Sequence, residues 1–323
     1  MLHYPPVPRP AGSPRIRRGT LDPRLLVVAA AVLWGTTGTA RALGPDDASP
    51  MAVGAARLVV GSACLLLAAR AAGVLPATRR SRASGGAPTA ARGTVAGSAP
   101  AHRPLAVAVL SVAAYQPLFF GGVARTGVAV GTVVGIGSAP VFAGVLGAVV
   151  RGERPDGRWV VATALALAGT GLLVGTGGGD DVDPTGIALA LGAGLAYAVY
   201  VLASKLLLDR GWPPDAVTVR VFGWAGALLV PVAVIAGVGP LLTPGGLVMV
   251  AHLGVVTVAV AYALFGRGLD GVGVGAAGTL TLAEPATAAV LGVVVVGERF
   301  GGTTAAGIAL VAAGLVVLVA RRR

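Results

Sequence analysis

Ten apolar segments, each about 20 residues long, constrain the fold of this chain more than any other feature. A helix needs about 20 apolar residues to cross the roughly 30 Å hydrocarbon core of a bilayer, because each residue adds about 1.5 Å. The spans of a β-barrel would be about ten residues long with alternating polarity, and these segments are not. The sequence therefore predicts an all-α membrane protein with ten transmembrane helices, at residues 25–43, 50–69, 105–124, 126–150, 159–175, 185–208, 216–237, 246–266, 272–296 and 303–320.

The amino-acid composition also indicates a bilayer as the surrounding solvent. Hydrophobic residues make up 55% of the 323 positions and charged residues 12%, whereas a soluble domain carries roughly 25% charged residues. The formal net charge of +12 could suggest a nucleic-acid partner, but the arginines lie between apolar segments instead of forming one folded basic face. We therefore expect no nucleic-acid partner.

No residue pattern indicates a metal, a cofactor or an enzyme. Cys64 is the only cysteine, so the chain can form neither an intramolecular disulfide nor a cysteine-based metal site. The sequence contains no His-Glu-x-x-His element and no nucleophile elbow. We expect no catalytic residue, no metal and no cofactor.

The positions of the basic residues predict the orientation of the chain. If the N-terminus lies inside, the arginine-rich connections also lie inside, and only Arg41, Arg125 and Arg299 lie outside. Cytoplasmic loops retain an excess of Lys and Arg. The sequence thus predicts a multi-pass protein of the cytoplasmic membrane with both termini cytoplasmic, a cytoplasmic N-terminal tail at residues 1–24 and a flexible cytoplasmic loop at residues 77–103.

An internal repeat is visible in the sequence. Aligning the Gly-Glu-Arg tripeptides at residues 152–154 and 297–299 also aligns Pro140 with Pro285 at the same offset. Apolar sequences resemble each other by chance, but a shared proline and a shared charged tripeptide in one register rarely do. The spans at residues 126–150 and 272–296 are therefore expected to correspond.

A second register relates the earlier parts of the two halves. It places Trp34 on Tyr197 and Arg57 on Arg220, and the surplus length of the 77–103 loop explains the change of offset. Each copy contains five spans, an odd number, so the second copy enters the membrane from the opposite side. The sequence predicts two inverted five-helix repeats, at residues 25–175 and 185–320, an architecture typical of secondary transporters with a midplane site.

Several of these elements together resemble a known family. They are the spacing from Pro140 to Glu153 and from Pro285 to Glu298, the Leu-Trp-Gly element at residues 33–35, Arg57, and the Leu-Ala-Glu-Pro tract at residues 282–285. The chain resembles the ten-helix EamA family of the drug/metabolite transporter superfamily over nearly all of its length. This resemblance implies a carrier of amino acids, carboxylates or other small metabolites without a covalent cofactor.

The leading hypothesis is a secondary transporter that exports an amino acid or a related small metabolite by alternating access. A carrier or exchanger of drugs, organic cations or carboxylates is the alternative, and a non-transporting membrane scaffold is a remote one. The expected partners are a small-molecule solute and the lipid bilayer, and a homodimer is left open.

Glu284 is the sharpest candidate for a substrate-binding or coupling residue. It lies near the middle of the ninth predicted span, where an ionised carboxylate is costly unless it faces water, a partner or a proton. It could bind a cationic group of the solute or take up a coupling proton. The alternative is a neutral carboxyl hydrogen-bonded between helices, and the matching position in the first half is Ala139.

Two matched arginines and a set of polar or aromatic residues complete the candidate site. Arg57 and Arg220 could bind anions or gate the two access routes, or they could extend to the nearest interface and cap carbonyl groups. The deeper polar-capable side chains could line a cavity or simply pack; they are Trp34, Tyr115, Gln116 and Tyr197, with Tyr200, Tyr262 and His252 as weaker candidates.

Four residues of the repeated motif are expected to be structural. Glu153 and Glu298 each precede a predicted helix and adjoin an arginine, so their carboxylates favour the helix N-terminus and local pairing. Pro140 and Pro285 lie at matched positions of the preceding spans. We interpret these four as hairpin and helix-shaping residues.

Overall fold

The computed structural model describes residues 21–73, 102–174, 183–297 and 302–319. These residues form helices and no strands, which confirms the predicted all-helical class for the part described. In chain order the helices are α1 (Pro23–Ala42), α2 (Pro50–Ala71), α3 (His102–Arg151), α4 (Gly157–Val174), α5 (Pro184–Asp209), α6 (Pro214–Ile235), the 3₁₀ turn η1 (Gly239–Leu242), α7 (Pro244–His252), the π-helical η2 (Leu253–Val260), α8 (Ala261–Asp270), α9 (Val274–Leu280), α10 (Ala283–Leu291), the π-helical η3 (Gly292–Val296) and α11 (Gly302–Val319).

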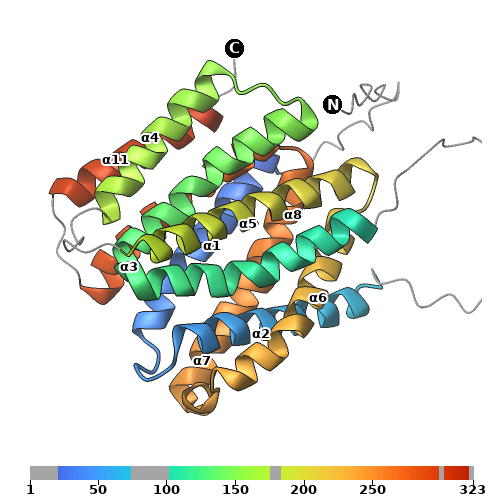
Figure 1. Ribbon diagram of the computed structural model, residues 1–323, viewed down its shortest axis with the longest axis vertical. Helices are drawn as coiled ribbons and strands as arrows, with labels where there is room; N and C mark the ends of the chain where they lie inside the picture. The colour runs from blue at the N-terminus through green and yellow to red at the C-terminus, as the bar shows by residue number, and fades with distance from the viewer. Residues whose placement is uncertain (1–20, 74–101, 175–182, 298–301, 320–323) are drawn as a thin grey trace, which may run out of the picture.

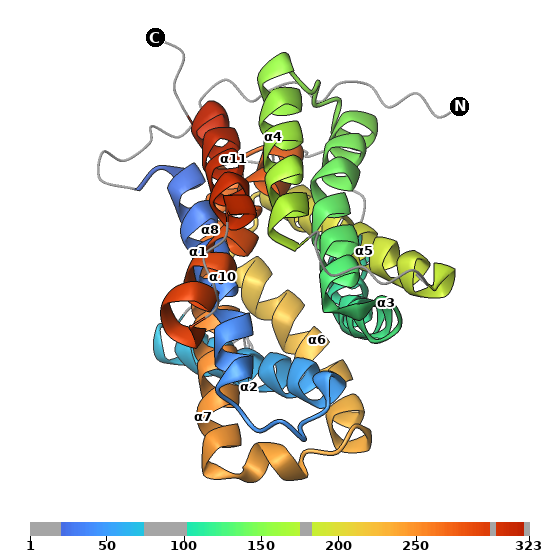
Figure 2. The ribbon, with the colours of Figure 1, turned by 90° about the vertical axis from the view of Figure 1, so that its left-hand side faces the viewer.

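The helices form a bundle with two distinct ends. Figure 1 and Figure 2 both show α4 and α11 side by side at one end, while α2, α6 and α7 gather at the other. Between them, α1 packs against α8, α10 and η2, and α3 packs against α5. Helices from distant parts of the sequence therefore meet in the middle of the bundle.

Eight helices of the described residues are long and apolar enough to cross a bilayer. They are Pro23–Ala42, Pro50–Ala71, His102–Thr126, Val134–Arg151, Pro184–Asp209, Pro214–Ile235, Pro244–Asp270 and Val274–Val296. A shorter apolar helix covers Ala305–Val319, and α4 occupies most of the predicted span at residues 159–175. The count of ten spans and the inverted repeats stay predictions. The N-terminal 20 residues and most of the 77–103 loop lie outside the described residues.

Residues 105–124 and 126–150, expected as separate spans, belong to one helical stretch of 50 residues, α3. A Cβ atom on Gly135 would lie 3.3 Å from Phe119 Cδ2, and one on Gly131 would lie 2.9 Å from Val123 Cα. A straight helix would hold Phe119 and Gly135 about 24 Å apart. The stretch therefore folds back on itself and forms two antiparallel arms, which we call the N-terminal arm (His102–Thr126) and the C-terminal arm (Val134–Arg151).

The starts of several helices follow directly from the local sequence. Asp22, Ser49 and Thr243 each cap a helix by accepting a backbone N–H bond of the first turn, and each is followed by proline. A side-chain oxygen at this position satisfies a free N–H, and proline lacks one to satisfy. Asp183 and Pro184 begin α5 in the same way. These pairs define where the chain turns back into the bundle.

The predicted span at residues 272–296 is broken in the middle, between α9 and α10. Pro285 has no N–H to donate to the carbonyl of Thr281, so the regular helical bond cannot form there. Instead the Glu284 N–H donates to the Thr281 carbonyl at 3.0 Å. The break places Glu284 in the first turn of α10, where the helix dipole favours a carboxylate.

The α1–α10 contact depends on the absence of a side chain at Gly35. A Cβ atom there would lie 2.5 Å from Thr287 Cβ and 2.8 Å from the Glu284 carbonyl oxygen. We expect Gly35→Ala to lower the free energy of unfolding by about 1–3 kcal/mol, because the backbone of α10 would have to shift. Thermal unfolding in detergent would measure this effect.

Gly38 is the matched control on the same helix. Nothing lies within 4 Å of a Cβ atom at this position, and alanine favours the helix by about 1 kcal/mol relative to glycine. Gly38→Ala should therefore leave the unfolding temperature unchanged or raise it. Equal unfolding temperatures for the two variants would contradict the tight α1–α10 contact.

Candidate functional site

A small cavity lies in the middle of the bundle. Its volume is about 50 Å³, which is room for a few water molecules. Both predicted repeats contribute to its wall, through α1, α2, both arms of α3, α5, η2, α8 and the α9–α10 break. The lining residues are Trp34, Thr37, Arg57, Tyr115, Gly135, Ile136, Ala139, Tyr197, Thr257, Tyr262, Thr281 and Glu284. We call it the central cavity.

Two opposite charges line the central cavity but do not form an ion pair with each other. Glu284 and Arg57 both line it, and both are half-buried. Among the described residues, no ion pair joins them, and the buried Nε of Arg57 has no hydrogen-bond partner there. Charged groups in such a setting are costly unless they are paired or hydrated. The cavity thus offers a carboxylate to a cation and a guanidinium to an anion.

An aromatic cluster forms one side of the central cavity. The ring centroids of Trp34 and Tyr262 lie 4.8 Å apart, and those of Trp34 and Tyr197 lie 6.4 Å apart in an edge-to-face arrangement. The indole N–H of Trp34 donates to the Thr257 carbonyl in the π-helical η2 at 2.9 Å. Because this bond holds Trp34 in place, its ring forms a rigid wall beside the charged groups.

Tyr115 approaches the cavity from the N-terminal arm of α3. Its ring stacks on Phe119 with centroids 5.5 Å apart. Ala139 of the C-terminal arm and Glu284 both line the cavity, and they are the two positions that the sequence repeat aligns. Matched positions therefore share one cavity, and only one of them carries a charge.

Two predicted site residues do not line the central cavity. Arg220 places its guanidinium carbon 4.6 Å from the centroid of the Trp212 ring, which is a cation–π contact. Gln116 is 2% exposed, and its amide oxygen lies 2.9 Å from where a Cβ atom of Gly54 would be. Gln116 therefore faces α2.

The remaining candidates are distributed over the bundle. His252 forms a hydrogen bond with Thr36 at 3.0 Å, and Tyr200 is buried in the aromatic cluster. Pro140 is buried in α3, and Pro285 is buried at the start of α10. Glu153 accepts a hydrogen bond from the side chain of Arg151, two residues earlier, and not from the adjoining Arg154. It also accepts one from the backbone N–H of Val274 in the second half of the chain. Glu298 lies outside the described residues.

Several lining residues were not anticipated from the sequence. Thr37, Thr257 and Thr281 contribute hydroxyl groups, and Gly135 and Ile136 complete the wall. Threonine and glycine are common throughout the apolar segments, so no local signal separates these four from the others of their kind, and Ile136 is an apolar residue in an apolar segment. Within the described residues, no cluster of three His, Cys, Asp or Glu side chains could hold a metal ion.

Comparisons with known proteins extend over nearly the whole chain. The EamA-like transporter family matches residues 24–175 and 184–320. An uncharacterized transporter of Bacillus subtilis, YwfM, is 41% identical over 300 residues, which are 93% of this chain and 94% of that protein.

Two further similarities are more limited. The threonine/homoserine exporter RhtA of Salmonella typhimurium is 35% identical over 173 residues, 52% of this chain and 57% of that protein. A solved crystal structure with a TM-score of 0.75 is 21% identical and covers 92% of this chain and 96% of its own. The similarity to this solved structure concerns the fold alone.

Proposed function

Because this chain belongs to the EamA-like transporter family, we propose that it is a secondary transporter that exports an amino acid or a related small metabolite. The family and the eight membrane-competent helices make the chain an integral membrane protein with a transporter role. The amino-acid class of the solute and the direction of transport are the proposal.

One observation carries the choice of solute: Glu284 and Arg57 line the same cavity without pairing with each other. An amino acid carries an ammonium group and a carboxylate group. Glu284 would bind the ammonium group, and Arg57 would bind the carboxylate through its planar array of N–H donors. The partial similarity to a threonine/homoserine exporter supports the same class of solute.

The proposed mechanism is alternating access between two inverted five-helix halves with both termini in the cytoplasm. The central cavity takes lining residues from both predicted halves, which suits a site exposed first to one side and then to the other. At about 50 Å³ it is too small for an amino acid, so its walls must separate before the solute binds. The proposed partners are the solute and the surrounding lipid.

The aromatic cluster supports a second candidate function, the transport of organic cations. Trp34 and Tyr262 present aromatic faces near Glu284, and such faces attract cations. An organic cation would use Glu284 and the aromatic wall but would leave Arg57 without a partner. This difference makes the two solute classes experimentally separable.

A comparison of threonine with its methyl ester tests the proposal. The ester keeps the ammonium group and lacks the carboxylate. We expect threonine at 100 times its Kd to stabilise the purified protein by about 2.7 kcal/mol and the ester to stabilise it far less. Thermal unfolding in detergent measures binding, and flux from proteoliposomes measures transport. Equal stabilisation by both compounds would favour the organic-cation function, and no response to either would contradict both.

A further inference from the structure

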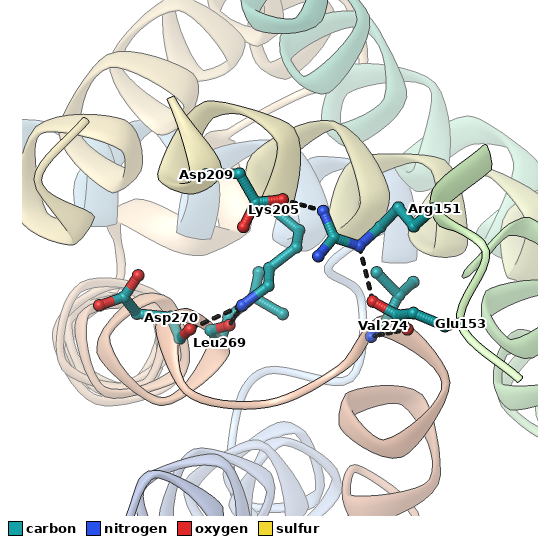
Figure 3. A network of polar contacts seen from close by, with 7 residues as sticks. All are labelled: Arg151, Glu153, Lys205, Asp209, Leu269, Asp270 and Val274. Carbon is teal, nitrogen blue, oxygen red and sulfur yellow. Dashed lines mark hydrogen bonds and ion pairs between the residues drawn. The ribbon is translucent and has the colours of Figure 1, made fainter. Parts of the chain in front are cut away.

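A polar network connects the end of α3 with three segments of the second half (Figure 3). Glu153 accepts one hydrogen bond from the Arg151 side chain at 2.6 Å and one from the backbone N–H of Val274 at 2.9 Å. Arg151 also pairs with Asp209 at the end of α5. Two contacts of this network, Glu153 with Val274 and Arg151 with Asp209, therefore cross from the first half to the second.

Lys205, which like Asp209 belongs to α5, binds the end of α8. Its ammonium group donates to the carbonyls of Leu269 at 2.8 Å and Asp270 at 2.6 Å. A cation is favoured at the C-terminal carbonyls of a helix. The ends of α3, α5 and α8 and the start of α9 are thus drawn together at one face of the bundle, the face that the sequence predicts to be cytoplasmic.

The network lies at one end of a tight seam between α9 and the C-terminal arm of α3. A Cβ atom on Gly278 would lie 3.0 Å from the Cα atom of Pro140 and from the Cβ atom of Ala143, and one on Gly275 would lie 3.1 Å from Gly144 Cα. Such contacts leave no space for a solute between the two helices. Glycine allows them because it has no side chain.

The seam separates two cavities. The central cavity reaches it at Ala139 and Thr281. A second cavity of about 430 Å³ reaches it at Gly144 and Gly275 and is bordered by Glu153 and the exposed loop that follows. We call this second cavity the vestibule. Along α9, the close contact of Gly278 with Pro140 and Ala143 lies between the residues that line the central cavity and those that line the vestibule.

We propose that Glu153 is the gating residue of this route: its hydrogen bond to Val274 holds α9 against α3 and closes the passage between the vestibule and the central cavity. This inference rests on the proposed transport function. Opening requires the Glu153 carboxylate to release the Val274 N–H, while Arg151 keeps its charge paired. The solute then passes from the vestibule to Glu284 and Arg57 as α9 moves away from the arm.

Thiol labelling of the central cavity tests the gate without any solute. Cys64 is replaced by alanine, and a single cysteine is introduced by Ala139→Cys, where the cavity wall meets the seam. A small membrane-impermeant thiol reagent is added from either side to vesicles of both orientations. We expect Glu153→Gln to raise the labelling rate from the vestibule side about tenfold, because one charge-assisted hydrogen bond is lost.

Asp156→Asn is the matched control. Asp156 lies in the same loop and also accepts a backbone N–H bond, from Trp159 at 2.8 Å, but that bond stays within the first half. Its labelling rate should stay within about twofold of the parent rate. Equal increases in both variants would show a general loosening of the loop and would overturn the proposal, as would an unchanged rate for Glu153→Gln.

A second variant opens the seam without removing a charge. Gly278→Ala inserts a methyl group against Pro140 and Ala143, so it should also raise labelling from the vestibule side, and it keeps the test valid if Glu153→Gln fails to fold. Threonine flux is measured in parallel. If both variants show the expected increase in labelling but the protein transports no threonine, the gate proposal stands and the amino-acid function is contradicted. If the protein transports threonine but neither variant changes the labelling rate, the gate proposal is contradicted.

Discussion

Replacing Glu284 by glutamine is expected to reduce amino-acid transport by about 100-fold. Glutamine keeps the shape of the side chain and removes the negative charge that would bind the solute's ammonium group. Loss of one partner from a buried charged pair costs about 3 kcal/mol, and each 1.4 kcal/mol is a factor of ten. Efflux of labelled threonine from proteoliposomes, at several pH values, would measure the loss.

Stability separates this function from a structural role of Glu284. Within the described residues, no hydrogen bond or ion pair of the Glu284 side chain is present. Glu284→Gln should therefore leave the unfolding temperature unchanged or raise it, because a half-buried carboxylate without a partner is costly. Asp215→Asn, which removes an exposed carboxylate paired with Arg267, is the control for charge removal elsewhere. A stable variant with full transport would exclude Glu284 from both binding and coupling.

Replacing Arg57 by glutamine is expected to abolish the preference of the protein for solutes with a carboxylate group over solutes without one. Of the described residues that line the central cavity, Arg57 alone carries a cationic group. A charge-assisted pair with a carboxylate contributes about 1.5–3 kcal/mol. Threonine binding should therefore weaken at least tenfold, while binding of threonine methyl ester should change little. Thermal-shift titrations with both compounds would measure the two affinities.

Arg220→Gln is the matched control, since the sequence repeat aligns Arg220 with Arg57. Its guanidinium packs on Trp212 instead of facing the cavity. Loss of this contact should cost about 0.5–2 kcal/mol of stability and leave the ratio of the two affinities unchanged. Equal losses of affinity in the two arginine variants would contradict the assignment of Arg57 to the solute carboxylate.

The different positions of Arg57 and Arg220 could not be predicted from the sequence. They occupy matching positions in the repeat, and nothing in their local sequence distinguishes a cavity residue from a packing residue. The distinction comes from the packing of the helices: Arg57 lines the same cavity as Glu284 of α10, whereas Arg220 meets the aromatic ring of Trp212 just before its own helix.

Glu284 could be selected from the sequence because its signal is local. A carboxylate in the middle of an apolar span is costly wherever the span packs, so its presence alone makes it a candidate for a functional residue. Trp34, Tyr115 and Tyr197 were expected to line a cavity for a weaker reason, their depth in the spans, and all three do. Gln116 has the same depth and does not, because rotation about the helix axis decides which side of α3 faces the cavity.

Glu153 shows a different limit. Its place beside Arg154 and before a helix predicts a local pair, and the structure shows a local pair with Arg151 instead. Its bond to Val274 joins residues that are distant in the chain. No sequence period or spacing encodes that meeting, because it depends on how closely α9 approaches the C-terminal arm of α3.

The sequence by itself determined the all-helical class, the long apolar segments and the charged residue at their centre, because the requirement to satisfy backbone hydrogen bonds in a bilayer acts on each segment separately. Only the tertiary structure decided that Glu284 and Arg57 share one cavity, and that Glu153 meets Val274 at the end of a closed seam. These features depend on the rotation, tilt and closest approach of helices. Packing between segments sets these quantities, so the sequence of a single segment does not predict them.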